Sequence, residues 1–224
     1  NEERTITELV KQLDALPKGV LTECIFVDDG STDSSSQLLS KALTGVHFKS
    51  QIVSKANGGK ASAIKEGAKA LTTTHVVILD SDLELATSDI ERLWQVVQSG
   101  ENDFVFGYRA FLAHSSFTYR YSRGNQVISS IYGILFNEVI TDIMCGYKLV
   151  PSETLQSLPF KYKHFGLEIE IPMQMWKKRM RPYEVEVHYH ARTRAEGKSI
   201  TVRDAIAIII SMATFRLSNR RTVP

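Results

Sequence analysis

The sequence predicts an α/β fold in which a mostly parallel sheet is flanked by helices. Through residue 109, short apolar segments alternate with amphipathic segments of about 10–15 residues, as expected for repeated strand–helix–strand units. Two of the apolar segments end in acidic clusters, at 28–29 and 80–84. Apolar residues make up 43% and charged residues 23% of the 224-residue chain, which is typical of a globular protein with a buried core.

The predicted helices and strands follow one another along the chain. The first segment, 2–16, repeats apolar residues every three or four positions from Ile6 to Leu16, a spacing typical of a helix with one buried face. Ser, Asp and Gly residues that favour turns and helix caps separate the later segments. We predict helices at 2–16, 31–43, 58–73 and 88–100, and strands at 20–30, 46–55, 74–82 and 103–109.

Beyond residue 110 the pattern is less regular. Segment 109–140 mixes aromatic and basic residues and then becomes helical. Further helices are predicted after 151 and at 166–180, and a strand at 182–192. His188 and His190 share one face of that strand, but no third ligand accompanies them, so we interpret them as exposed strand residues rather than a metal site.

The most apolar segment lies near the C-terminus. "AIAIIISMATF", residues 205–215, has 11 residues, fewer than the roughly 20 that span a bilayer. Arginines such as Arg203 and Arg216 flank it. Three interpretations stay open: a core helix, an interfacial helix on a membrane, or the approach to an anchor outside this sequence.

The net charge of +2 conceals an asymmetry. Residues 1–160 contain 14 Lys/Arg and 19 Asp/Glu, whereas residues 161–224 contain 13 and 6. This predicts a basic C-terminal surface that faces phospholipid, nucleic acid or a phosphorylated substrate. Cys24 and Cys145 lie far apart, so a reducing compartment is expected. The chain opens on "NEERTI" without Met and shows no signal peptide, and we expect residues upstream of it.

The acidic strand ends are candidates for chemistry. Because ligands of open α/β sheets bind beyond the carboxyl ends of the strands, both clusters should share one crevice. Asp80 and Asp82 can both reach a hard cation from a turn, and Mg²⁺ or Mn²⁺ often completes its shell with substrate phosphates. Asp28 and Asp29 can accept hydrogen bonds from a ribose or a base. Lys60 follows two glycines at a helix start, a plausible site for a phosphate.

The order of these motifs resembles glycosyltransferase family 2, whose members have the nucleotide-sugar-binding GT-A fold. The landmarks are "NEE" at 1–3, "VDDGSTD" at 27–33, "NGGKASAIKEG" at 57–67 and "LDSDLE" at 79–84. The second half, including "TDIMCGYKLVP" at 141–151, is similar to the dolichyl-phosphate-mannose-synthase-like branch. Those enzymes load a sugar onto a polyprenyl phosphate at the cytoplasmic membrane face. The strand and Pro-x-Tyr that usually precede "NEE" in the family are absent here.

The resemblance implies roles for individual residues on the donor side. Glu84 stands where this branch often has Gln, and it too would reach the metal. The residues implied are Asn1, Glu2, Asp28, Asp29 and Lys60 at the nucleotide, with Asp80 and Asp82 at the metal and diphosphate.

On the acceptor side, Asp142 falls where the wider family keeps a carboxylate, which is the general base in enzymes with hydroxyl acceptors. A phosphate acceptor is already anionic and instead needs cationic positioning, which Arg supplies bidentately. Glu168 and Glu170 belong to a segment that lines the acceptor side in this branch. The candidates for binding the acceptor phosphate are Arg109, Arg120, Arg123, Arg192, Arg194 and Lys198.

The leading hypothesis is a Mg²⁺- or Mn²⁺-dependent inverting enzyme that moves a sugar from a UDP or GDP donor to a polyprenyl phosphate. We expect residues 1–200 to form the GT-A catalytic domain and 201–224 a membrane-proximal helix on the cytoplasmic side, held peripherally or through segments outside this sequence. We expect no nucleic-acid partner, and the chain is compatible with a homo-oligomer. The alternatives are transfer to a glycan hydroxyl, a binding module without turnover, and a sugar-1-phosphate nucleotidyltransferase.

Overall fold

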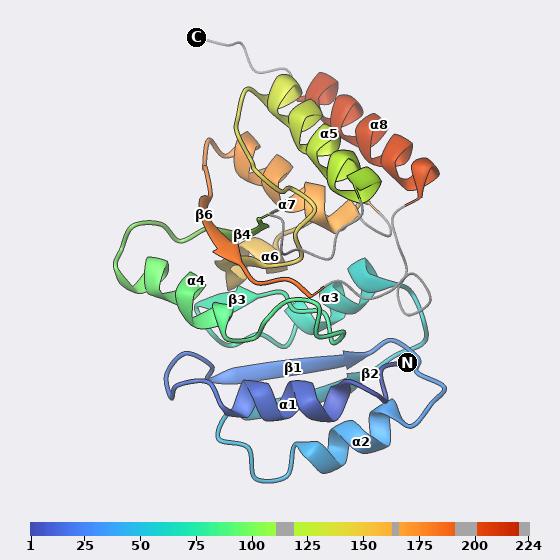
Figure 1. Ribbon diagram of the computed structural model, residues 1–224, viewed down its shortest axis with the longest axis vertical. Coiled ribbons are helices and arrows are strands. Elements are labelled where there is room, and N and C mark those ends of the chain that lie inside the picture. Colours follow the sequence, from blue (N-terminus) through green and yellow to red (C-terminus); the bar gives the residue numbers. More distant parts are fainter. Residues whose placement is uncertain (111–118, 163–165, 191–200, 220–224) are drawn as a thin grey trace.

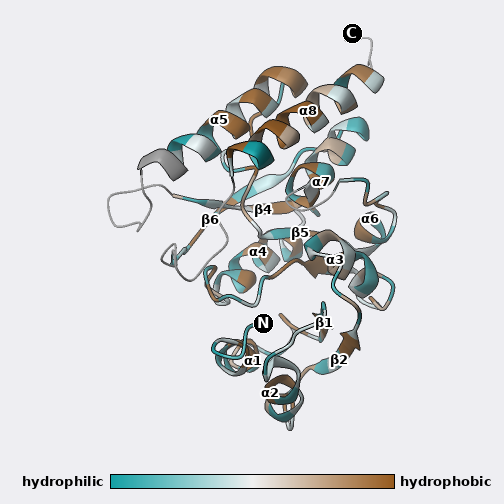
Figure 2. Cartoon of the chain, turned by 90° about the vertical axis from the view of Figure 1, so that its right-hand side faces the viewer, coloured by the Kyte–Doolittle hydropathy of each residue, from teal (hydrophilic) through white to brown (hydrophobic). Residues whose placement is uncertain are grey.

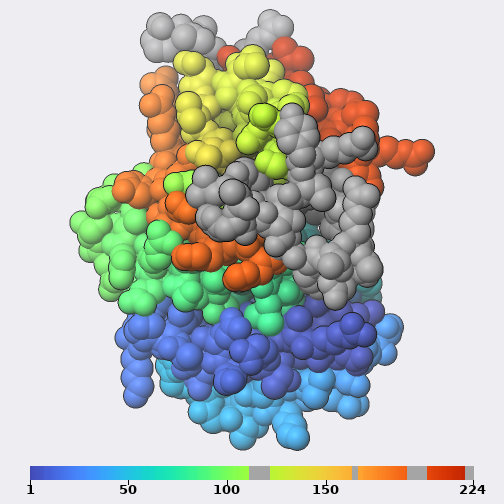
Figure 3. Space-filling view, in the orientation of Figure 1, coloured from blue at the N-terminus to red at the C-terminus, as the bar shows by residue number. Residues whose placement is uncertain are grey.

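The computed structural model describes residues 1–110, 119–162, 166–190 and 201–219, with side chains from residue 122 onward in the helix that begins at Tyr119. The elements lie in layers (Figure 1). The N-terminal helices and first two strands lie at one end, and two helices from the second half lie at the other. The space-filling view shows the same order on the surface, with the start of the chain and the C-terminal helix at opposite ends (Figure 3).

Two sets of hydrogen-bonded strands form the sheet structure. β1 (Glu23–Asp28) pairs in parallel with β2 (Lys49–Ser54). The other set has the order β3-β5-β4-β6. Its members are β3 (His75–Val77), β4 (Val105–Arg109), β5 (Lys148–Pro151) and β6 (Tyr183–Val187).

Most strands of the second set run in one direction. β4 pairs in parallel with β6, and β5 runs antiparallel to both β3 and β4, so β3, β4 and β6 share a direction and β5 opposes them. The α/β class with a mostly parallel sheet is therefore confirmed. β5 itself was not predicted, because four residues are too few to show a period of two.

Helices cover these strands because each has one apolar face. In α1, Ile6, Leu9, Val10 and Leu13 are all buried, as the helical spacing predicts. α3 packs closely on β1, and a Cβ on Gly67 would lie 3.0 Å from a methyl group of Val27. The first half contains α1 (Ile6–Asp14), α2 (Ser35–Ala42), α3 (Lys60–Ala68) and α4 (Asp89–Gln98).

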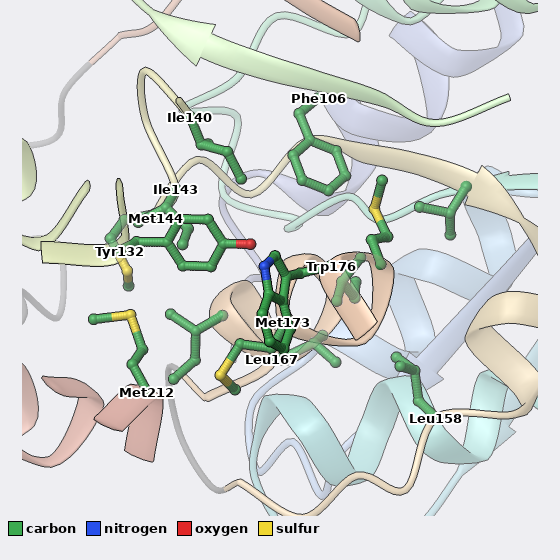
Figure 4. Close-up of a cluster of buried hydrophobic side chains, with 14 of the residues drawn as sticks. Phe106, Tyr132, Ile140, Ile143, Met144, Leu158, Leu167, Met173, Trp176 and Met212 are labelled. Carbon is green, nitrogen blue, oxygen red and sulfur yellow. The ribbon is translucent and has the colours of Figure 1, made fainter. Parts of the chain in front are cut away.

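The sheet separates two buried cores. Val105 and Leu149 belong to one core, and their chain neighbours Phe106 and Val150 belong to the other. This alternation follows because successive side chains of a strand point to opposite faces. In the second core, Tyr132, Trp176 and Met212 converge from three helices, as Figure 4 shows.

The second half supplies α5 (Tyr119–Phe136), α6 (Ser152–Gln156), α7 (Gly166–Lys177) and α8 (Val202–Ser218). α8 begins at a capping box between Thr201 and Asp204. It lies beside α5 in both cartoon views (Figures 1 and 2). Both helices contain many hydrophobic residues (Figure 2).

α8 has two apolar faces. Met212 and Phe215 are buried against α5 and α7, so the interpretation of 205–215 as a core helix is correct for this face. Ile206, Ile210 and Leu217 lie on the other face and are 52%, 59% and 62% exposed. Over the described residues, no helix combines the length and apolar character that crossing a membrane requires.

Candidate functional site

The first two residues of the chain lie against the loop that follows β1. The side-chain oxygen of Asn1 accepts a hydrogen bond of 2.7 Å from the backbone N–H of Thr32. The N–H of Glu2 donates to the hydroxyl of Ser35 at 2.7 Å. Figure 1 shows the N-terminus beside the carboxyl end of β1. Asn1 and Glu2, both predicted at the nucleotide, thus lie beside the segment that follows Asp28 and Asp29.

The two aspartates at the end of β1 fix different turns. The Asp28 carboxylate accepts from the N–H of Ser31 at 2.8 Å. The Asp29 carboxylate accepts from the N–H groups of Gly58 and Gly59, at 2.9 and 2.7 Å, and pairs with Lys55. Burial opposes ionisation of Asp29, but these donors outweigh it and hold the pKa of Asp29 below its usual value.

Lys60, the first residue of α3, bridges two carboxylates. Its Nζ lies 2.7 Å from Oδ2 of Asp80 and 2.9 Å from Oε1 of Glu168. Burial by itself would lower the pKa of Lys60, but the charges of Glu168 and Asp80 raise it above its usual value. Lys60 is therefore a cation at neutral pH, and it offsets the repulsion expected within the acidic cluster.

Asp82 and Glu84 are turned to other partners. An oxygen of Asp82 accepts from the N–H of Glu84 at 3.1 Å, and the intervening Leu83 adopts a positive φ of 59°. The carboxylate of Glu84 accepts from the hydroxyl of Tyr189 at 2.7 Å. In the part of the chain that the structure describes, no three His, Cys, Asp or Glu side chains are grouped to hold a metal.

A glycine allows the backbone to approach Asp80 closely. A Cβ on Gly146 would lie 3.2 Å from Oδ2 of Asp80 and 3.9 Å from Nζ of Lys60. The Asp80 side chain is 41% exposed. Two carboxylates at Asp80 and Asp82 suit a hard cation that takes its remaining ligands from a diphosphate and water, so the chemistry of the donor set fits a Mg²⁺ or Mn²⁺ ion.

Two residues predicted to act separately are paired with each other. Nε of Arg109 lies 2.6 Å from one oxygen of Asp142, and Nη2 lies 3.0 Å from the other. Their side chains are 6% and 0% exposed. The guanidinium of Arg109 also lies over the ring of Tyr189, at 5.1 Å. The pair ties the end of β4 to the turn that carries Gly146.

Sequence reasoning missed Lys148, a buried residue that binds the backbone of the turn between Asp142 and Gly146. Its Nζ donates to the carbonyl oxygens of Ile143 and Cys145, at 3.0 and 2.6 Å, and lies 5.2 Å from the centre of the Phe106 ring. Burial lowers the pKa of Lys148. The only signal in the sequence is a lysine inside the apolar "GYKLVP", where a buried charge needs partners.

The remaining predicted residues lie elsewhere or outside the described residues. Arg123 is exposed on α5 and donates to Gln126 at 3.0 Å. Glu170 accepts from the N–H of Lys161 at 2.9 Å, and burial raises the pKa of Glu170. The side chain of Arg120 and all of Arg192, Arg194 and Lys198 lie outside the part described.

The two histidines predicted in a strand lie just beyond the end of β6. Nδ1 of His188 lies 3.0 Å from the buried carboxylate of Asp89, and the N–H of His190 donates to the carbonyl oxygen of Glu84 at 2.8 Å. Both residues are at least partly exposed. They fix strand β6 and the following residues to the segment after β3, and neither belongs to a metal cluster among the described residues.

Comparison with known proteins identifies the family. Residues 1–167 match the family described as glycosyl transferase family 2. The chain belongs to glycosyl transferase family 2. Membership confirms the resemblance inferred from the motifs at 1–3, 27–33, 57–67 and 79–84, and it makes the chain a glycosyltransferase.

Curated relatives of this family 2 glycosyltransferase include an archaeal and several bacterial proteins. An uncharacterized protein of Methanocaldococcus jannaschii is 27% identical over 80% of this chain and 79% of its own length. An undecaprenyl-phosphate 4-deoxy-4-formamido-L-arabinose transferase of Klebsiella pneumoniae is 33% identical over 42% of this chain. That match spans only 29% of the Klebsiella enzyme.

Solved structures share the fold. Glucosyl-3-phosphoglycerate synthase from Mycobacterium tuberculosis, in complex with Mn²⁺, UDP and glucosyl-3-phosphoglycerate, aligns with a TM-score of 0.72. The two sequences are 20% identical, and the alignment covers 98% of this chain and 76% of the Mycobacterium chain. The predicted GT-A architecture of this family 2 glycosyltransferase is thereby confirmed.

Proposed function

We propose that this family 2 glycosyltransferase is an inverting, metal-dependent enzyme that moves a sugar from a UDP- or GDP-sugar to a polyprenyl phosphate. The observation that carries the proposal is the series of contacts that links Asp29, Lys60 and Asp80. The turn bound by Asp29 leads directly into Lys60, and Lys60 contacts Asp80. Anionic and cationic groups so close together support binding of a nucleotide diphosphate and its metal ion.

On the donor side, Asp80 and Asp82 would hold a Mg²⁺ or Mn²⁺ ion. A divalent cation at this position neutralises the charge of a diphosphate leaving group. Asn1, Glu2, Asp28 and Asp29 line the end of β1, where carboxylates and backbone groups would bind the base and ribose. Glu84 is engaged by Tyr189, so its role as a third ligand requires that contact to open. The Mycobacterium synthase with the same fold binds Mn²⁺ and UDP, which supports the choice of ligands.

On the acceptor side, the bacterial relatives use undecaprenyl phosphate. A phosphate oxygen is already anionic at neutral pH and needs no general base to attack. Asp142 is a poor general base because both of its oxygens accept from Arg109 and its side chain has no exposed surface. This favours a phosphate over a glycan hydroxyl as acceptor. We assign acceptor positioning to the basic residues Arg120, Arg123, Arg192, Arg194 and Lys198, and a supporting role to Arg109.

The acceptor lipid implies a membrane surface on the cytoplasmic side, reached peripherally or through segments outside this sequence. The exposed apolar residues of α8 supply a contact for it, together with Val127 and Ile134 of α5, which are 54% and 82% exposed. Arg203 of α8 is exposed, and basic residues near an apolar face favour binding to anionic lipid.

The test is a panel of UDP- and GDP-sugars with Mn²⁺ or Mg²⁺, a short-chain polyprenyl phosphate and an oligosaccharide acceptor. Glycolipid formation that is lost in Asp82→Asn supports the proposal. Transfer to the oligosaccharide alone would select the hydroxyl-acceptor alternative. Donor binding with no turnover on any acceptor would make the protein a binding module.

A further inference from the structure

Lys60 occupies one oxygen of Asp80, a carboxylate proposed above to bind the metal. Its Nζ lies 2.7 Å from Oδ2 of Asp80, so a divalent ion bound to the same oxygen would lie close to a second cation and be repelled by it. A divalent ion that binds Oδ2 of Asp80 therefore competes with Lys60 for that oxygen.

Glu168 provides a place for the displaced ammonium group. It lies in the first turn of α7 and already binds Nζ of Lys60 through Oε1, at 2.9 Å. Its other oxygen, Oε2, is buried and has no hydrogen-bond partner among the described residues. A buried carboxylate oxygen without a donor is costly, and the ammonium group of Lys60 already contacts the other oxygen of the same carboxylate.

We propose that Glu168 is a positioning residue that receives Lys60 when a divalent metal takes Asp80. Before the metal binds, Lys60 bridges the two carboxylates. When the metal is bound, Lys60 rests on both oxygens of Glu168, which satisfies Oε2 and keeps the lysine charge paired. The exchange makes the metal site conditional on the movement of one side chain. The inference rests on the proposed metal-dependent function and extends it to two residues, Lys60 and Glu168.

The two residues have opposite expected effects on metal affinity. Lys60→Met removes the competing cation, so Mn²⁺ should bind the protein roughly tenfold more tightly. Glu168→Gln removes the alternative partner of Lys60 and commits the lysine to Asp80, so Mn²⁺ should bind several-fold more weakly. Lys60→Arg keeps the positive charge and should leave the affinity near that of the unchanged protein.

The experiment is a titration of the protein with Mn²⁺ alone, with free Mn²⁺ measured by electron paramagnetic resonance and folding of each variant checked by circular dichroism. The double variant Lys60→Met/Glu168→Gln separates positioning from direct charge effects. If Glu168 acts through Lys60, Glu168→Gln has little effect once Lys60 is Met. An equal loss in both backgrounds, or no gain in Lys60→Met, would overturn the inference.

Failure of this inference and failure of the proposed function give different results. If the unchanged protein binds no Mn²⁺ and Asp82→Asn makes no difference, the metal-dependent function itself fails. A different result would overturn only the exchange of Lys60 between Asp80 and Glu168. In that case the unchanged protein binds Mn²⁺, Asp82→Asn abolishes binding, and the Lys60 and Glu168 variants have the same Mn²⁺ affinity as the unchanged protein.

Discussion

Arg109 and Asp142 form a bidentate ion pair inside the protein, 33 positions apart in the sequence, with contacts of 2.6 and 3.0 Å. The resemblance to family 2 makes Asp142 the candidate base, and the sequence predicts Arg109 as a ligand for the acceptor phosphate. Because the two side chains are bound to each other, their main effect is to hold the turn from Asp142 to Gly146 in its conformation.

We predict that Asp142→Asn destabilises the protein by about 3–5 kcal/mol, because it leaves a buried guanidinium without its counter-charge. The double variant Arg109→Met/Asp142→Leu should recover much of that loss. Urea unfolding measures both, and Arg123→Gln on the exposed face of α5 is the matched control, with a change within about 0.5 kcal/mol. Lost transfer with unchanged stability in Asp142→Asn would instead assign Asp142 to the chemistry.

Gly146→Ala should impair the site with little effect on the fold. The new methyl group would lie 3.2 Å from Oδ2 of Asp80, so Asp80 must move. We expect kcat/KM for sugar transfer to fall roughly tenfold or more, since small displacements of a positioned group are costly to catalysis. Gly124→Ala is the control, because nothing lies within 4 Å of a Cβ there. Equal activity of the two variants would mean that sugar transfer does not depend on the close approach of Gly146 to Asp80.

The lowered pKa of Asp29 predicts a pH-dependent contribution to stability. Because the folded-state pKa is depressed, the contribution is fully present above the unfolded-state value, about 3.9. It is lost as the pH falls from there through the lower folded-state pKa. The difference in unfolding free energy between the unchanged protein and Asp29→Asn should therefore be constant near neutral pH and shrink below about pH 4. Urea titrations from pH 7 to pH 3 measure it, and a difference that does not change over this range would contradict the assignment.

The two faces of α8 should respond differently to substitution. Met212→Ala removes a fully buried side chain and should cost about 2–5 kcal/mol. Ile210→Ala on the exposed face should change stability by less than about 0.5 kcal/mol. If this face contacts membrane, Ile206→Asp and Ile210→Asp should weaken binding to anionic vesicles in a flotation assay. Unchanged vesicle binding would remove α8 from the membrane contact.

The elements that could be predicted from sequence are those with long, regular patterns. α1 and α4 show helical periodicity over ten residues or so, and the end of β1 at Asp28 is marked by acidic residues after an apolar segment. The strand predicted at 74–82 is shorter in the structure, where β3 ends at Val77. The turn held by Asp29 leads into Lys60, which contacts Asp80, so the two acidic clusters are connected, while the crevice expected between them stays a prediction.

The remainder depends on contacts that no local pattern encodes. The pairing of Arg109 with Asp142 and the burial of Lys148 arise because the chain returns between β3 and β4 as the short antiparallel β5. Each of these residues taken alone resembles an ordinary surface charge. The position of β5 in the sheet brings Lys148 to the carbonyl oxygens of Ile143 and Cys145 and brings Asp142 to Arg109.

The link between Lys60 and Glu168 spans 108 positions, whereas Lys60 and Asp80 are separated by only 20. The chain is synthesised from the N-terminus, so Lys60 and Asp80 leave the ribosome well before α7 does. Closing a loop as long as the one to Glu168 also costs more chain entropy than closing the short one. The bridge from Lys60 to Glu168 can therefore be complete only after α7 has packed into the second core.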